Sequence, residues 1–195
     1  MRIPWSYSWT LLGVALLLPF AMEYFPGTKV LPDYGLVPDF HLVERSGREV
    51  RRAELAGAPW VADFIFTRCS GSCPALSARM TKLQDALGDR VRMVTFSVDP
   101  EHDTPRVLSE YASRLGASNR WLFITGDTSE LRKLVTDGFH LSAVEKNVSA
   151  AEPLLTHSDR FALVDENLHI RQYYLGTEDG CIDQLRGDLE SLATR

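Results

Sequence analysis

The sequence is poor in cysteine and contains no block of basic residues. Three cysteines in 195 residues are too few for a fold built from disulfides. Acidic residues outnumber basic residues by 26 to 21, and the formal net charge is -5, so we expect no nucleic-acid partner. Internal repeats and low-complexity tracts are also missing. What remains is a globular composition, with 45% hydrophobic and 24% charged residues.

Charged residues are scarce near the N-terminus. The stretch from Trp5 to Phe25 is almost free of charge, and about twenty apolar residues can cross a bilayer as a helix. Arg2 is the only positive charge ahead of this stretch. It contains no cysteine, which excludes a lipoprotein anchor, and no clean small-residue cleavage site follows it. We therefore expect residues 1–26 to be a membrane anchor, with a cleaved signal peptide as the alternative. Both would send the remaining chain across the membrane.

Two prolines follow the apolar stretch. Pro32 and Pro38 disfavour helix in the residues that precede them. Residues 27–37 are therefore expected to form a tether, and residues 38–195 to form the folded domain.

Strands and helices are expected to alternate in that domain. Short apolar, β-rich runs predict five strands, the last two paired around a turn, at residues 61–66, 91–98, 121–124, 161–164 and 169–174. Apolar residues at helical spacing predict helices at residues 75–87, 105–115, 129–138 and 182–192. Thr104 is expected to cap the second of these helices. The order predicts a three-layer α/β fold with a central sheet.

The most informative feature is the sequence Cys69-Ser-Gly-Ser-Cys73-Pro74, directly after the first predicted strand. If Cys73 opens a helix, four residues are about one turn, so both thiols can point the same way. Such a pair can form a disulfide or bind a soft metal, whereas the plain alternative is two ordinary buried cysteines. Its place in a strand-to-helix loop favours a reactive or metal-binding pair. Arg68 and the helix N-terminus are expected to lower the pKa of the thiols.

Two carboxylates follow the predicted strand 91–98. If that strand runs parallel to residues 61–66, Asp99 and Asp103 emerge at the same edge of the sheet as the thiols. They could then position or charge-balance a site there. Alternatively, Asp103 or Thr104 simply caps the helix that follows.

A third ligand would have to come from another part of the chain. Four of the five histidines, His41, His102, His140 and His169, occur near strands, turns or helix ends without a partner motif. His157 lies directly before the strand 161–164, in a loop that faces the thiols in a thioredoxin-like topology. Two thiolates and an imidazole form a three-coordinate soft site that suits Cu(I). A closed structural zinc site would need a fourth ligand.

Four motifs occur together and in a recognisable order: Phe64-Ile-Phe-Thr-Arg-Cys69-x-x-x-Cys73-Pro74, Ser97-Val-Asp-Pro100-x-x-Asp-Thr-Pro105, Trp121-Leu-Phe-Ile-Thr-Gly126, and Thr156-His-Ser158 followed by Phe161-Ala-Leu-Val-Asp165. In these motifs the sequence resembles the Sco/SenC family of copper proteins, from about Pro38 to Tyr174. The resemblance implies a thioredoxin-like fold with a single N-terminal transmembrane helix. It places the domain in the bacterial periplasm or the mitochondrial intermembrane space.

The same resemblance implies a ligand set and partners. Cys69, Cys73 and His157 would bind copper as Cu(I) or Cu(II). The protein would deliver copper to the CuA-bearing subunit of cytochrome c oxidase, or maintain the thiols of that subunit. An upstream copper donor or thiol reductant would be a further partner. Cys181 has no role in the family pattern.

Two function classes therefore stay open, a copper metallochaperone and a thiol–disulfide oxidoreductase, so we leave open whether the protein is an enzyme. His157 discriminates between them, because a reductase needs only the two thiols. The C-x-x-C spacing of a thioredoxin is missing, and Thr156-His157 stands where a thioredoxin has Thr-Pro with a cis bond; both count against a general reductase. A peroxidase is a more remote alternative, because it would need a peroxide-binding Thr-x-x-Cys motif. Here Thr67 lies only two residues before Cys69.

Overall fold

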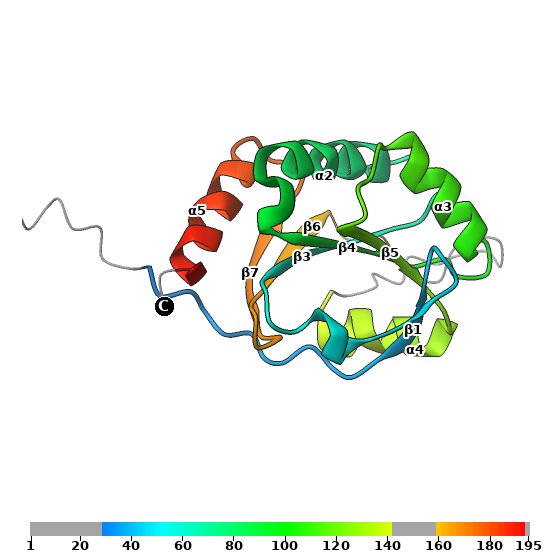
Figure 1. The fold of residues 1–195 in the computed structure, drawn as a ribbon, viewed down its shortest axis with the longest axis horizontal. Helices are drawn as coiled ribbons and strands as arrows, with labels where there is room; N and C mark the ends of the chain where they lie inside the picture. Colours follow the sequence, from blue (N-terminus) through cyan, green and yellow to red (C-terminus); the bar gives the residue numbers. More distant parts are fainter. Residues whose placement is uncertain (1–28, 142–158, 194–195) are drawn as a thin grey trace, which may run out of the picture.

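The chain folds around one seven-stranded sheet with helices on both faces (Figure 1). The computed structural model describes residues 29–141 and 159–193. In chain order the elements are β1 (His41–Glu44), β2 (Glu49–Arg51), η1 (Arg52–Leu55), β3 (Trp60–Ile65), α2 (Cys73–Leu87), η2 (Gly88–Arg90), β4 (Arg92–Ser97), α3 (Pro105–Arg114), β5 (Trp121–Thr125), α4 (Thr128–Lys133), η3 (Leu134–Gly138), β6 (Arg160–Val164), β7 (Ile170–Leu175) and α5 (Cys181–Ala193).

The strand order across the sheet is β2-β1-β5-β4-β3-β6-β7. The three central strands β3, β4 and β5 are parallel, and β1 and β6 flank them in antiparallel pairing. Ile65 pairs with Ser97, so β3 and β4 end at the same edge of the sheet. All six residues of β3 are buried, as expected for a central strand covered on both faces.

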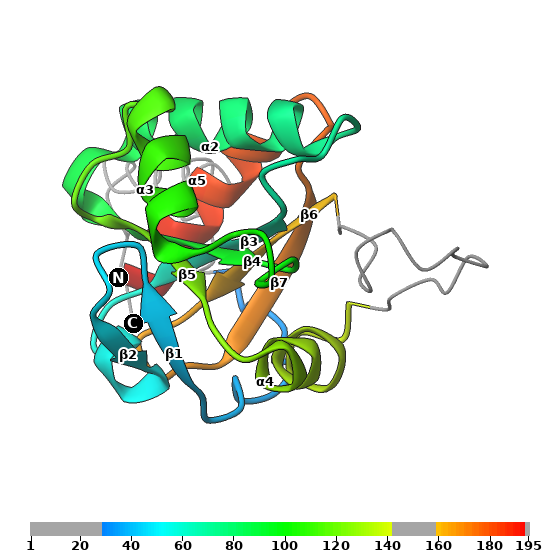
Figure 2. The same cartoon turned by 90° about the vertical axis from the view of Figure 1, so that its right-hand side faces the viewer.

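Two hydrophobic cores lie on opposite faces of the sheet. Figure 2 shows α2, α3 and α5 over one face and α4 under the other. In β3, Val61 belongs to the core under α2, α3 and α5, whereas Trp60 and Phe64 belong to the core on the α4 side. This alternation is the two-residue period of a strand, and it confirms the predicted three-layer α/β arrangement.

The expected strands and helices are present, but some boundaries differ. The helix expected over 129–138 is shorter, because α4 ends at Lys133 and a π-helical turn, η3, continues to Gly138. The hairpin of β1 and β2 was not predicted. Its strands are only four and three residues long and carry charged residues, so they show no sustained alternation of apolar and polar side chains.

Residues 29–37, which we expected to belong to a tether, lie along β7. Tyr34 donates its backbone N–H to the Ile170 carbonyl at 2.9 Å, and Ile170 donates to Gly35 at 2.9 Å. Leu31 and Val37 are buried. We refer to residues 29–37 as the strap, because these residues cover β7, an edge strand of the sheet.

The predicted anchor, residues 1–26, lies outside the described residues. In residues 29–141 and 159–193, no helix has both the length and the apolar character needed to cross a bilayer.

Two glycines offer a matched test of the packing. A methyl group at Gly138, the last residue of η3, would lie 2.6 Å from Cδ of Pro38, the residue that follows the strap. Gly138→Ala should therefore lower the free energy of unfolding by about 1–3 kcal/mol. Gly187 lies inside α5 with no atom near its missing Cβ, so Gly187→Ala should raise it by about 0.5–1 kcal/mol. Urea unfolding of both variants measures the two effects, and equal changes at the two sites would contradict the described contact.

Candidate functional site

The two cysteines of the motif lie in the loop between β3 and α2, residues 66–72, and at the first residue of α2. Cys69 is partly exposed, whereas Cys73 is buried. Cys69 donates its N–H to the Phe66 carbonyl at 3.2 Å, and its Sγ accepts the Gly71 N–H at 3.3 Å. Both thiols are free, and they are hydrogen-bonded to each other. The expected helix start and the expected convergence of the thiols are therefore present.

The electrostatic environment of Cys73 differs from our expectation. Burial raises the pKa of the Cys73 thiol, and its hydrogen bond with Cys69 and the negative charge of Asp63 act in the same direction. The prediction of a lowered pKa is therefore wrong for Cys73. One reason is that the Arg68 guanidinium donates from Nε to Asp99 Oδ2 at 2.6 Å, so a carboxylate offsets its charge.

Asp103 joins the thiol loop to the loop after β4. Its carboxylate is fully buried and accepts from the Thr67 N–H at 3.0 Å, from Thr67 Oγ1 at 2.5 Å and from Ser97 Oγ at 2.7 Å. The helix cap comes from Thr104, whose hydroxyl accepts the Val107 N–H. Asp103 therefore supports the backbone two residues before the first thiol, and the alternative that it caps α3 is wrong.

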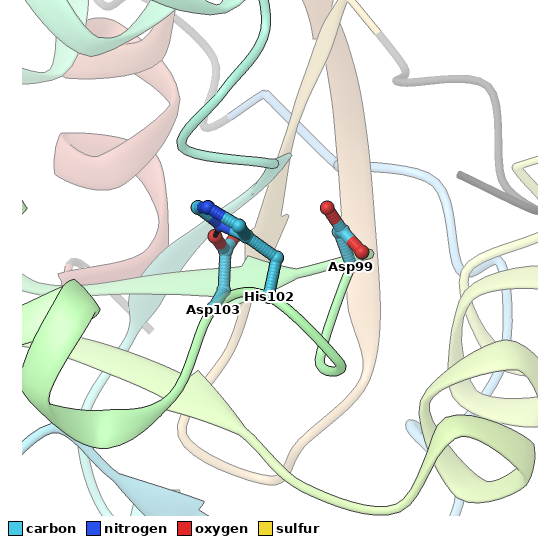
Figure 3. Close-up of side chains that lie close together, drawn as sticks. All are labelled: Asp99, His102 and Asp103. Atoms are coloured by element: carbon cyan, nitrogen blue, oxygen red, sulfur yellow. Dashed lines mark hydrogen bonds and ion pairs between the residues drawn. The ribbon is translucent and has the colours of Figure 1, made fainter. Parts of the chain in front are cut away.

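Asp99, His102 and Asp103 lie together on the loop between β4 and α3 (Figure 3). Their potential ligand atoms are within 4.8 Å of one another. His102 Nδ1 lies 2.9 Å from Asp103 Oδ1, and Asp99 is paired with Arg68. These contacts describe a hydrogen-bonded network rather than a set of open ligands. His102 was not predicted to lie near the site, because it has no partner motif in the sequence. Its position next to Asp103 was the signal that it would lie near the thiol loop.

A buried carboxyl group that the sequence reasoning missed lies in β3. Asp63 is fully buried, and its Oδ1 accepts from Thr95 Oγ1 at 2.5 Å, while Thr95 Oγ1 also accepts from Trp121 Nε1 at 2.8 Å. Among the described residues, Oδ2 of Asp63 has no partner. Burial raises the pKa of Asp63 to about 7. The available signal was a single acid inside an otherwise apolar strand.

His157 lies outside the described residues, in the segment 142–158. The chain resumes at Asp159, two residues later, and this residue contacts the thiol loop. Ser72, the residue before Cys73, donates from Oγ to Asp159 Oδ1 at 2.5 Å. The Asp159 carbonyl accepts the Gly176 N–H at 2.7 Å. The start of β6 is therefore tied directly to the loop that carries the cysteines.

The other histidines have surface environments. His41 lies 2.8 Å from Glu49, His169 lies 3.0 Å from Asp33, and His140 is exposed. None of these contacts, within the described residues, brings an imidazole to the thiols.

Cys181 is separate from the pair in the thiol loop. It is the first residue of α5, it is buried, and its thiol is free. Burial raises the pKa of this thiol as well. Its environment is that of a small core residue.

Most of the chain is similar to one known protein family. The model of the SCO1/SenC family matches residues 30–193. The chain belongs to the SCO1/SenC family. A SCO1 protein homolog of Bacillus subtilis is 34% identical over 163 residues, which cover 81% of this chain and 83% of that protein. A SCO2-like protein of Rickettsia felis is 30% identical over 143 residues, which cover 70% of this chain and 68% of the relative.

Solved structures of this family share the fold. The structure of BsSco, described as a member of the Sco family of cytochrome c oxidase assembly proteins with a disulfide switch, superposes with a TM-score of 0.73 at 33% identity and covers 85% of this chain and 97% of its own. A SCO1/SenC family lipoprotein from Bacillus anthracis gives 0.74 at 26% identity, with coverage of 85% and 99%. Copper-bound ScoI of Bradyrhizobium japonicum has the same fold, with a TM-score of 0.67 at 23% identity and coverage of 81% and 99%.

The buried carboxyl of Asp63 predicts a specific dependence of stability on pH. Its pKa is about 7 in the folded protein and 3.8 in an ordinary environment, so the folded state holds one more proton than the unfolded state between these values. Stability from this group is therefore lost as the pH rises from about 4 to 7, by up to about 4 kcal/mol. Asp63→Asn should remove that slope in urea unfolding of the reduced, metal-free protein. Wild-type and variant curves that stay parallel across this range would contradict the assignment.

Proposed function

We propose that the protein is a membrane-anchored copper metallochaperone that binds copper through Cys69, Cys73 and His157 and delivers it to the CuA site of cytochrome c oxidase. The observation that carries the proposal is the pair of free, mutually hydrogen-bonded thiols at the edge of the sheet, in a SCO1/SenC chain. Copper is the cargo of the protein in this proposal. Family members with copper bound support the choice of metal.

The donor atoms fit a soft metal ion. Thiolate sulfur selects Cu(I), and imidazole is compatible with copper in either oxidation state. Thiolates bind metal only after losing their protons. Because Cys73 holds its proton firmly, copper binding at this site should release a proton and strengthen as the pH rises.

The environment of the two thiols suits a site that passes its cargo on. Cys69 is partly exposed, so the sulfurs of a partner can reach it and exchange for it as ligands. Cys73 is buried and fixed at the helix start. We propose that Asp103, through Thr67, and Asp99, through Arg68, hold the loop in this arrangement without touching the metal.

The proposal for His157 is supported by the end of the segment that carries it. Asp159 accepts a hydrogen bond from Ser72, which lies between the two cysteines in sequence. Two residues span at most about 7 Å of chain, which is within reach of an imidazole ligand.

We further propose that residues 1–26 anchor the protein and that the folded domain lies across the membrane. This would be the periplasm of a bacterium or, in a eukaryote, the mitochondrial intermembrane space. The apolar stretch of the sequence supports the anchor. The strap would fix how the domain leaves it, because residues 29–37 are held along β7.

A second candidate function is reduction of the CuA-site cysteines by thiol–disulfide exchange. The free, hydrogen-bonded thiols favour it, and the structure of BsSco is described as containing a disulfide switch. The partly exposed Cys69 would attack a disulfide of the partner, and Cys73 would then attack Cys69 and release the partner. The partner gains two electrons and two protons and leaves with two thiols, while Cys69 and Cys73 end as a disulfide.

Copper affinity separates the two functions. His157→Ala should weaken Cu(I) binding by about 100-fold or more in a competition titration with a chromophoric chelator, because one of three ligands is lost. The same variant should still form the Cys69–Cys73 disulfide. The exposed histidine of β1 supplies a matched control, and His41→Ala should leave the affinity unchanged.

Cysteine variants complete this experiment. Cys69→Ser or Cys73→Ser should abolish tight binding, whereas Cys181→Ser should retain one copper per chain. Unchanged affinity in His157→Ala would contradict the three-ligand site and favour the oxidoreductase. Loss of copper from Cys181→Ser would contradict the assignment of the thiols.

A further inference from the structure

The strap carries most of the exposed, large apolar side chains of the described residues. Val30, Tyr34 and Leu36 are 80%, 43% and 49% exposed. In residues 29–141 and 159–193, Leu175 of β7 is the one other large apolar side chain with comparable exposure, at 40%. Single exposed apolar residues are common, whereas three in one short segment are typical of an interaction site. We call Val30, Tyr34 and Leu36 the apolar stripe.

Contacts with β7 hold the stripe against the domain. Leu31 points inward and is buried. Arg171 donates from Nε to the Pro32 carbonyl at 2.7 Å and from Nη2 to the Leu31 carbonyl at 2.8 Å. The ring of Tyr34 meets the ring of Tyr173 edge to face, with 5.2 Å between the centroids. The stripe is therefore a fixed surface of the folded domain.

The charge nearest to the stripe is already engaged. Asp33 is the one charged residue between Val30 and Leu36. Its Oδ1 accepts the Gly35 N–H at 2.9 Å and lies 3.0 Å from Nδ1 of His169. A carboxylate with such partners opposes contact with an apolar environment less than a free carboxylate does.

The stripe and the thiol loop lie at opposite ends of the sheet. Val37, directly after the stripe, donates its N–H at 2.9 Å to the carbonyl of Leu168, in the turn between β6 and β7. β6 ends at Val164, which pairs with Trp60 at the start of β3, whereas the thiols follow Ile65 at the other end. Six residues of strand span roughly 20 Å. Figure 1 shows the strap, in blue, passing α5 and crossing the end of β7.

The sequence places the stripe close to the proposed anchor. Residue 26 ends that anchor, and Val30 follows four residues later. Four residues span at most about 14 Å of chain. The polar headgroup layer on each side of a bilayer is about 5–8 Å thick. Val30 therefore stays close to the headgroups of the bilayer that holds the anchor.

We propose that the apolar stripe docks on the surface of this bilayer, and that the contact directs the thiol loop away from the membrane. The inference rests on the anchor of the proposed function. Aliphatic and tyrosine side chains suit the boundary between headgroups and acyl chains. Three partly exposed side chains offer far less than the roughly 800 Å² that each partner buries in a stable protein interface. A weak contact suffices for an anchored chain, because the anchor keeps the stripe at a high effective concentration beside the lipid.

Photo-crosslinking of the full chain in phosphatidylcholine liposomes tests this contact. Leu36 is replaced by p-benzoylphenylalanine, and mass spectrometry of the intact protein after irradiation detects covalent lipid adducts. Position 36 lies ten residues after the anchor, whereas a label at Val30 would meet lipid whatever the domain does. We expect a lipid adduct at position 36. The same label in place of Leu175, which pairs with Arg160 at the thiol end of the sheet, should give none.

A substitution in the stripe supplies a second comparison. Val30→Asp, in the chain labelled at position 36, should reduce the lipid adduct, because a carboxylate would have to enter the interface. Leu175→Asp in the same labelled chain should leave the adduct unchanged. No lipid adduct at position 36, or equal adducts at positions 36 and 175, would overturn the docking. A cross-link between two copies of the chain in place of the lipid adduct would also overturn it.

Extraction of the liposomes with alkaline carbonate tests the anchor separately. Release of the chain would contradict the anchor, whereas a retained chain without the adduct would contradict the docking alone.

Discussion

The parallel pairing of β3 with β4 determines where the chemistry of this protein can occur. Because Ile65 is paired with Ser97, the loop that carries the thiols and the loop that carries Asp99 and Asp103 leave the sheet side by side. The buried carboxylate of Asp103 then joins the two loops through three hydrogen bonds. The antiparallel strand β6 pairs with β3 on its other side, and Asp159, the residue before β6, reaches the same loop from there. Three segments distant in sequence therefore converge on Cys69 and Cys73.

Burial shapes the chemistry of this edge more than charge does. The one cation next to the first thiol, Arg68, is offset by Asp99, and Cys73 and Asp63 both lie in the interior with raised pKa values. A reactive cysteine with a strongly lowered pKa would need an uncompensated positive charge close to its sulfur. The environment of Cys73 instead keeps its thiol protonated until something displaces the proton. A soft metal ion can do this, which is consistent with the proposed cargo.

Much of this arrangement could be predicted from the sequence. The central strands, the helix opening at Cys73, the Thr104 cap and the shared edge of the two loops follow from local patterns and from the rule for parallel strands. The order of the motifs also identified the family. The β1–β2 hairpin was missed because its strands are too short for a periodic signal. The packing of the strap was missed because its prolines indicate only that it is not helical, whereas its hydrogen bonds to β7 depend on the tertiary fold.

The details of the site depended on the same kind of tertiary information. Asp63 is a single acid in an apolar strand, and only the tertiary fold shows that it is fully buried and that its charge helps to raise the pKa of Cys73. His102 lacked a partner motif, and only the course of the β4–α3 loop shows that it contacts Asp103. The lowered pKa expected for the thiols failed for Cys73 chiefly because the sequence does not show that this thiol is buried. Nor does it show that Asp99 pairs with Arg68 and offsets its charge.

The central claim is that copper is held by two sulfurs and one imidazole nitrogen. X-ray absorption spectroscopy at the copper edge, on the full chain loaded with one Cu(I), tests it most directly. The account predicts two sulfur neighbours and one nitrogen neighbour, with the outer-shell scattering of a histidine ring that disappears in His157→Ala. A first shell of sulfur alone, or one completed by oxygen or nitrogen that persists in His157→Ala, would contradict it.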